Sequence, residues 1–111
     1  MKKFLLVLGI CFLLCGCSSN KVESEVENIM KEGNYIIVDV RTKDEFMKNH
    51  VIGAINIPYD EIDGSNLDKD KTIFVYCRSG SRSKVAFDRL TELGYMVYDL
   101  GAFDDVDLPK E

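Results

Sequence analysis

The chain has 111 residues, of which 46% are hydrophobic, and it carries 14 basic and 19 acidic residues for a net charge of −5. A chain of this length accommodates one small domain, and its hydrophobic content permits a real core. It holds no basic stripe that could bind a phosphate backbone, so we expect no nucleic-acid partner.

The amino-terminal segment has the pattern of a secretory signal. Lys2 and Lys3 precede an apolar run over residues 4–14, which is shorter than the roughly 20 residues needed to span a bilayer. The run ends in Leu14-Cys15-Gly16-Cys17, which resembles a bacterial lipobox with Cys17 as the lipidated residue. An ordinary signal peptide or an uncleaved anchor is the alternative.

The lipobox interpretation divides the chain into three parts. We predict a lipoprotein signal peptide over residues 1–16, a lipidated (palmitate-bearing) Cys17 with a short tether to residue 21, and one domain over residues 22–111. The protein is then expected on the extracytoplasmic face of the cell membrane, held through the lipid on Cys17. In the mature chain Cys77 is the only free thiol.

The rest of the chain alternates between helix and strand patterns. Helices are predicted over residues 20–31, where Asn20 and Glu23 form a capping box, and in a short turn after Thr42. Short apolar runs predict strands over residues 35–40, 54–57, 73–76 and 95–100, and a polar loop with a helical turn covers residues 59–71. Strands that alternate with helices imply a three-layer α/β domain with a mostly parallel sheet and helices on both faces.

The strand over residues 73–76 leads directly into the most reactive stretch of the chain. Cys77 follows this strand, and a short polar loop then enters a helix predicted from Ser83 to the stop at Gly94. Loop N–H groups and a helix N-terminus favour negative charge, and Arg78 and Arg82 add two cations. These features predict a cysteine pKa below about 8.5, and the charges beside Cys77 argue against a buried, inert thiol.

Two motifs carry a resemblance to a known family. The first is Cys77-Arg78-Ser79-Gly80-Ser81-Arg82-Ser83, which resembles the active-site loop of the rhodanese-like sulfurtransferases. The second runs through Asp39-Val40-Arg41, Glu45-Phe46 and His50-Val51-Ile52-Gly53-Ala54-Ile55-Asn56-Ile57-Pro58 and is similar to a further motif of that family. The Gly101-Ala102-Phe103 segment resembles the family's closing pair of glycines, with Ala102 in place of the second glycine.

The resemblance implies a role for each residue of the loop. Cys77 is the expected nucleophile, and the residues expected to bind the substrate anion are Arg78, Ser79, Gly80, Ser81, Arg82 and Ser83. Asp39 and Arg41 are expected to support the site. Asp39, at the end of its strand, is interpreted as a structural acceptor for loop N–H groups or for Arg41, and a catalytic carboxylate is the alternative. His50, the one histidine of the sequence, could act as a general base, but the resemblance implies a structural place in the loop that leads into the strand over residues 54–57. A thiol of low pKa needs no general base. No cofactor or metal is expected, since the sequence holds no Cys/His cluster.

The predicted reaction moves sulfane sulfur from thiosulfate or a polysulfide to cyanide or a thiol through a Cys77 persulfide. One alternative is a persulfide carrier or binding module without significant turnover. A less favoured alternative is a cysteine-dependent phosphatase, but four residues separate Cys77 from Arg82, one fewer than in phosphatase loops. A tighter loop suits a sulfur atom better than a phosphoryl group with its equatorial oxygens.

Overall fold

The computed structural model describes the backbone of residues 15–111 and the side chains from residue 24 onward. It divides into two compact units, Met1–Gly33 and Asn34–Glu111. Most of the predicted signal peptide and the side chain of Cys17 lie outside the described residues. The lipid anchor and the division of the chain around it therefore stay predictions.

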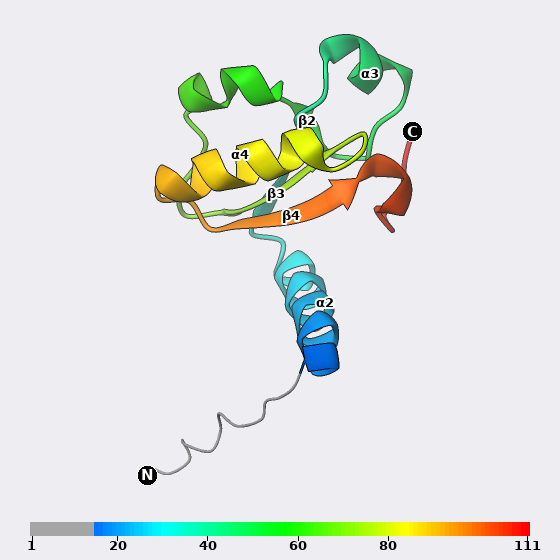
Figure 1. Ribbon diagram of the computed structural model, residues 1–111, viewed down its shortest axis with the longest axis vertical. Coiled ribbons are helices and arrows are strands. Elements are labelled where there is room, and N and C mark those ends of the chain that lie inside the picture. Colours follow the sequence, from blue (N-terminus) through cyan, green and yellow to red (C-terminus); the bar gives the residue numbers. More distant parts are fainter. Residues whose placement is uncertain (1–14) are drawn as a thin grey trace. The chain divides into compact units, whose positions relative to one another are not determined.

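The first unit contains the helix α2, which runs over Cys15–Glu32 (Figure 1). The prediction that this helix begins at Asn20 is wrong, because the helix starts at Cys15 and places Asn20 in its interior. No proline or strand-forming run interrupts residues 15–19, so the helix extends through them once it has formed. Gly33, at φ 81°, ends it. Over the described residues, no helix is both long and apolar enough to cross a membrane.

The second unit is built on a four-stranded sheet in which every strand pair is parallel. The strands are β1 (Tyr35–Asp39), β2 (Ile55–Asn56), β3 (Thr72–Cys77) and β4 (Val97–Ala102), in the order β2-β1-β3-β4. The predicted parallel α/β arrangement is confirmed. Parallel pairing brings the carboxyl ends of β1 and β3 to the same edge of the sheet, where the polar loops follow.

The strand β4 begins and ends later than the predicted 95–100. Tyr95 is still tied to the preceding helix, because its N–H bonds to the carbonyl of Leu90 at 3.0 Å. At the other end, Gly101 and Ala102 pair with the last residues of β3, after a register shift that accommodates one extra residue in β4. Ala102 consequently lies directly beside Cys77.

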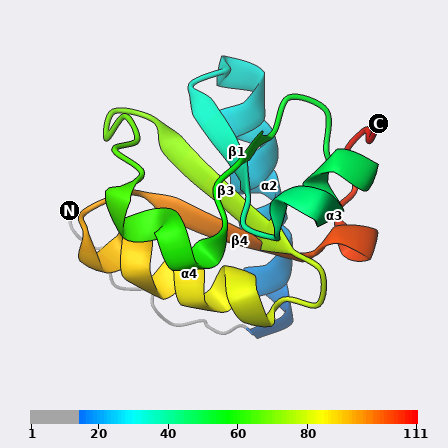
Figure 2. The same cartoon turned by 90° about the horizontal axis from the view of Figure 1, so that it is seen from above.

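One face of the sheet is covered by helix α4 (Ser81–Glu92) and the 3₁₀ helix η3 (Tyr59–Gly64), as Figures 1 and 2 show. The buried cluster on this face is formed by Val38, Val40, Ile62, Ile73, Val75, Cys77, Ala86, Leu90 and Val97. Leu90 is fully buried, and burial of such a side chain contributes roughly 1.5–3 kcal/mol. Gly94, at φ 98°, ends α4 as predicted.

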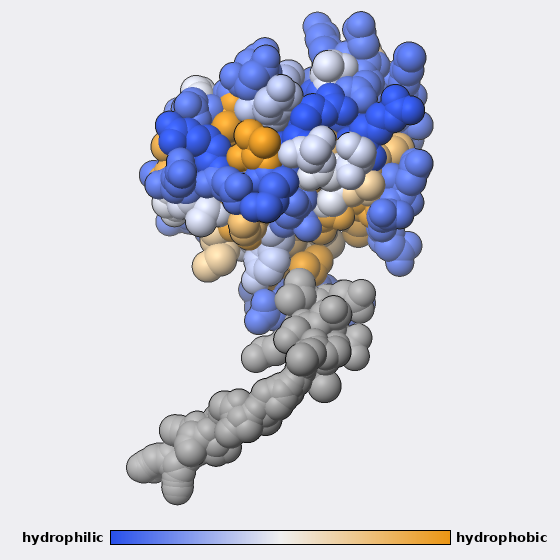
Figure 3. Space-filling view, in the orientation of Figure 1, coloured by the Kyte–Doolittle hydropathy of each residue, from blue (hydrophilic) through white to orange (hydrophobic). Residues whose placement is uncertain are grey.

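The short helix α3 (Lys43–Lys48) and the C-terminal segment lie side by side near the carboxyl edge of the sheet (Figures 1 and 2). The predicted capping box of α3 is present, with Thr42 and Glu45 bonding to each other's backbone N–H. After the 3₁₀ helix η4 (Phe103–Asp105), the chain returns to pair Lys110 with Val51. The face shown in Figure 3 is largely hydrophilic, with hydrophobic residues in small separate patches.

Candidate active site

The loop that follows β3 wraps around the sulfur of Cys77. Gly80 adopts a left-handed conformation at φ 100°, which a residue without Cβ tolerates best. This turn points the Gly80 N–H at the Cys77 Sγ, at 3.0 Å. The helix α4 then begins at Ser81, two positions before the predicted Ser83, so the thiol lies closer to the helix N-terminus than the sequence suggested.

Cys77 is fully buried, so the expectation that neighbouring charges would keep it exposed is wrong. The loop backbone covers the sulfur while the side chain of Arg78 extends into solvent. Burial does not make the thiol inert, because the groups that cover it are hydrogen-bond donors. A thiolate formed here exchanges water for fixed N–H and O–H groups.

Hydrogen bonds offset the cost of burying the charge. Burial raises the pKa of the Cys77 thiol, but the hydroxyl of Ser83 and the N–H groups of Ser83, Gly80 and Ser79 together hold the pKa below its ordinary 9.0. The Ser83 hydroxyl is the largest of these favourable contributions. The sequence pointed to loop N–H groups and arginine charges, but not to this hydroxyl. Its position as the third residue of α4, facing back over the helix start, is the signal that would have identified it.

Arg82 lies beside the thiol, and its guanidinium forms an ion pair with Glu45. Its Nη1 and Nη2 bond to Glu45 Oε1 and Oε2 at 2.8 and 3.1 Å, a two-pronged pairing of the kind arginine makes with carboxylates. The negative charge of Cys77 raises the pKa of Arg82, after the larger effect of Glu45. The guanidinium thus contributes to the field at the sulfur while it joins the loop to α3.

Arg78 differs from Arg82 in having no ion-pair partner among the described residues. Its side chain is exposed and immediately follows Cys77. The loop therefore presents one paired and one unpaired guanidinium to an incoming anion.

Comparison with known proteins agrees with this geometry. Residues 22–105 match the family described as Rhodanese-like domain. The chain belongs to the rhodanese-like family. It is 38% identical over 78 residues to the thiosulfate sulfurtransferase PspE of Escherichia coli, covering 66% of this chain and 75% of that protein. This similarity supports sulfurtransferase activity.

A solved rhodanese from E. coli, described as containing anions, superposes with a TM-score of 0.64 at 36% identity, over 69% of this chain and 96% of that one. A longer relative, the probable molybdopterin-synthase adenylyltransferase of Pyropia yezoensis, is 41% identical over 59 residues. That match covers 50% of this chain and 16% of the relative, so this chain spans only a small part of that protein's length.

The two supporting residues of this rhodanese-like domain form a buried ion pair. Asp39 accepts from Arg41 Nε at 2.9 Å and Nη2 at 2.6 Å, and also from its backbone N–H. The guanidinium packs over the ring of Phe103 at 4.4 Å and donates to the Asn49 carbonyl. Burial and Asp39 raise the pKa of Tyr76 above its ordinary value.

This ion pair is on the opposite face of the sheet from the thiol. Successive strand residues point to opposite faces, so Tyr76 faces Asp39 and Arg41 while Cys77 faces α4. The pair fixes the segment after β1, consistent with the interpretation of Asp39 as a structural acceptor. His50 also has a structural setting: it stacks on Phe46 at 4.0 Å and its Nε2 lies 3.1 Å from Glu111 Oε2.

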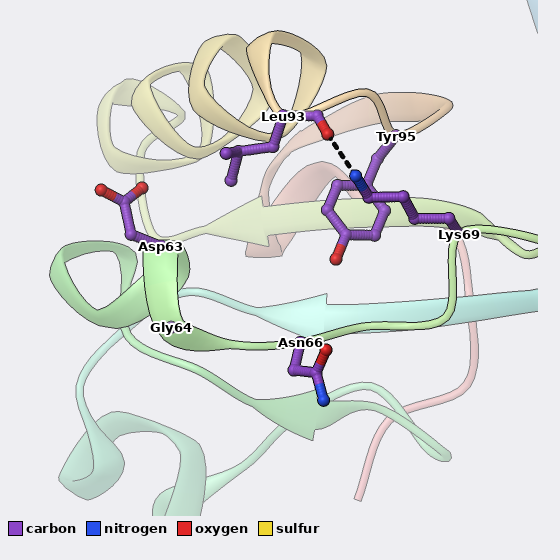
Figure 4. Close-up of a pocket in the computed structure, with 6 residues that line it drawn as sticks. All are labelled: Asp63, Gly64, Asn66, Lys69, Leu93 and Tyr95. Atoms are coloured by element: carbon purple, nitrogen blue, oxygen red, sulfur yellow. Dashed lines mark hydrogen bonds between the residues drawn. The ribbon is translucent and has the colours of Figure 1, made fainter.

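A cavity of about 370 Å³ lies at the other end of α4 (Figure 4). It is lined by Asp63, Gly64, Asn66, Lys69, Leu93 and Tyr95. Its one ammonium group, on Lys69, already donates to the Leu93 carbonyl at 2.7 Å. Because the cavity is at the C-terminal end of the helix and Cys77 precedes the N-terminal end, it is separate from the thiol site.

Proposed function

We propose that this rhodanese-like domain transfers sulfane sulfur from a small anionic donor such as thiosulfate to a thiophilic acceptor, through a persulfide on Cys77. The observation that carries the proposal is the Gly80 N–H that points at the Cys77 Sγ at 3.0 Å, together with the Ser83 hydroxyl and the N–H groups of Ser83 and Ser79, which lower the pKa of the thiol. A donor set of this kind favours the thiolate, which is the nucleophilic form of cysteine.

The reaction consists of two displacements at sulfur. In the first, the Cys77 thiolate attacks the outer sulfur of thiosulfate, a new S–S bond forms, and the old S–S bond breaks with its electron pair leaving on sulfite. In the second, cyanide or a thiolate attacks the outer sulfur of the persulfide, and the electron pair of the S–S bond returns to Cys77. Both the thiolate and the persulfide are anionic, so the same loop donors serve both states.

The residues around the loop have distinct roles in this scheme. The exposed, unpaired guanidinium of Arg78 attracts the donor anion. Arg82 contributes charge at the sulfur and, through Glu45, fixes the start of α4. Phosphate-ester hydrolysis fits less well, because the loop is one residue shorter than that of cysteine phosphatases.

The test compares the wild-type protein with Cys77→Ser in assays with thiosulfate plus cyanide, and with an aryl phosphate. Thiocyanate should form only with the wild type, with ping-pong kinetics, and neither protein should hydrolyse the phosphate. Thiocyanate formation by Cys77→Ser at the wild-type rate would refute the mechanism. Fast persulfide formation with slow release to cyanide, but fast release to a protein thiol, would identify a carrier instead.

We further propose that the domain acts at the membrane surface, held by lipid on Cys17. Support for this comes from the order of basic residues, apolar run and Leu14-Cys15-Gly16-Cys17 in the sequence. A domain tethered in this way meets donors and acceptors outside the cytoplasm.

A further inference from the structure

Glu45 joins two parts of the domain that are far apart in sequence. Its Oε1 accepts from the N–H of Thr42 at 3.0 Å and the hydroxyl of Thr42 at 3.1 Å, as part of the α3 capping box. The same carboxylate accepts both prongs of Arg82 at the start of α4. One side chain thus caps one helix and pairs with the active-site loop of another.

This carboxylate stays charged and stays in place. Hydrogen bonding from Arg82 lowers the pKa of Glu45 to about 2, so it is ionised at any pH at which the enzyme would work. Three groups donate hydrogen bonds to this carboxylate and hold it in position: the Thr42 backbone N–H, the Thr42 hydroxyl and the Arg82 guanidinium. Only 26% of its side chain and 25% of the Arg82 side chain are exposed, which limits screening by solvent.

The fixed negative charge of Glu45 next to Arg82 reduces the positive potential that the loop presents to a sulfur donor. The positive charge of Arg82 is largely compensated, and Arg78 is the one cation of the loop without a carboxylate partner in the described structure. Each additional negative charge on the donor gains less from Arg82 and meets repulsion from Glu45. A dianion is penalised more than a monoanion.

We propose that Glu45 determines donor specificity by acting through Arg82, so that sulfane donors with one negative charge are favoured over the thiosulfate dianion. The thiosulfonate monoanions belong to the favoured class. This inference rests on the proposed function for the choice of donors, and it adds a residue outside the cysteine loop to the site. Glu45 is a positioning residue: it makes no direct contact with the donor and acts by pairing with Arg82 and by its negative charge.

The first experiment needs no sulfur transfer. Cys77 is alkylated with iodoacetate, an anion, and with iodoacetamide, which is neutral, in the wild type, in Glu45→Gln and in the control Asp44→Asn. Glutamine has nearly the shape of Glu45 and keeps one oxygen that can accept from Thr42, but it has no charge and its amide nitrogen cannot accept the second prong of Arg82. Asp44 is an exposed neighbour on the same turn of α3. The iodoacetate-to-iodoacetamide rate ratio should rise roughly five- to tenfold in Glu45→Gln, as expected for removal of one unit charge from a partly solvated site. It should stay unchanged in Asp44→Asn.

The second experiment measures KM and kcat with thiosulfate and with methanethiosulfonate. In Glu45→Gln the KM for thiosulfate should fall relative to that for methanethiosulfonate by a similar factor, with kcat changed equally for both donors. Glu45→Ser, which also lacks the charge but no longer contacts Arg82, should shift the ratios in the same direction. Circular dichroism establishes that each variant is folded.

Two results would overturn the inference. One is an unchanged alkylation ratio in both neutral variants. The other is an equal loss of rate with both alkylating reagents, which would mean that Glu45 only maintains the loop's shape. If the alkylation ratio shifts as expected but the wild type transfers no sulfur, the electrostatic role of Glu45 stands and the proposed function fails.

Discussion

Removing the Ser83 hydroxyl tests how the thiol is activated. Ser83 is fully buried, and its hydroxyl is the largest of the favourable contributions to the lowered pKa of Cys77. The hydroxyl has one proton, which it directs to the Gly80 carbonyl at 3.1 Å or to the sulfur. Ser83→Ala removes this donor while the three backbone N–H groups remain.

The size of the effect follows from the nature of the bond. A hydrogen bond to a charged group contributes roughly 1.5–3 kcal/mol, and one pKa unit corresponds to about 1.36 kcal/mol. These values predict an increase of about 1–2 units in the pKa of Cys77, towards its ordinary 9.0. Well below both pKa values, the thiolate fraction and the alkylation rate would fall about tenfold for each unit.

The assay is the rate of Cys77 alkylation by iodoacetamide as a function of pH. The wild-type rate should rise with pH and level off below 9.0, and the Ser83→Ala curve should be displaced to higher pH. Ser81→Ala is the matched control, because the Ser81 side chain is exposed and its hydroxyl only approaches that of Ser79. Coincident curves for the wild type and Ser83→Ala would refute the role of the hydroxyl.

Three further predictions concern other parts of the chain. Arg78→Ala should raise the KM for thiosulfate roughly three- to tenfold with little change in kcat. The control Lys71→Ala removes the same charge at the far end of β3 and should leave the KM unchanged. Equal KM values for the wild type and Arg78→Ala would exclude Arg78 from anion binding. Asp39→Ala should lower the free energy of urea unfolding by about 3–5 kcal/mol, because it leaves the buried Arg41 unpaired, and a loss within the error of the wild type would contradict the importance of the pair. Cys17→Ser should leave the precursor unlipidated, as judged by labelling with radioactive palmitate and by membrane fractionation; labelling equal to that of the wild type would contradict the lipobox interpretation.

The parallel sheet and the order of its elements could be predicted because each strand is a short apolar run followed by a turn. The apolar runs Ile73 to Tyr76 and Ile36 to Val38 predict β3 and β1, because strands whose two faces are both buried have continuous apolar sequences. The end of α4 was equally clear from Gly94. Strand ends that depend on pairing with a neighbouring strand could not be predicted from the local sequence. Gly101 and Ala102 belong to β4 only because they pair with β3.

The nucleophile and its loop were also predictable, but the state of the side chains around them was not. The sequence places Glu45 in a capping box with Thr42, and nothing in its local pattern indicates a partner 37 residues away. The burial of Cys77 depends on the left-handed turn at Gly80, which folds the backbone over the sulfur. The first feature arises from a tertiary contact and the second from a local backbone turn, and hydrophobic periodicity encodes neither.

The central claim, a persulfide on Cys77, is tested most directly by the intact mass of the purified protein after incubation with thiosulfate and removal of excess reagent. The wild type should gain the mass of one sulfur atom, the added sulfur should map to the peptide that contains Cys77, and cyanide should remove it with release of thiocyanate. Cys77→Ser should show no gain. An unmodified wild-type mass after incubation with thiosulfate alone, in a preparation that produces thiocyanate once cyanide is added, would contradict the account.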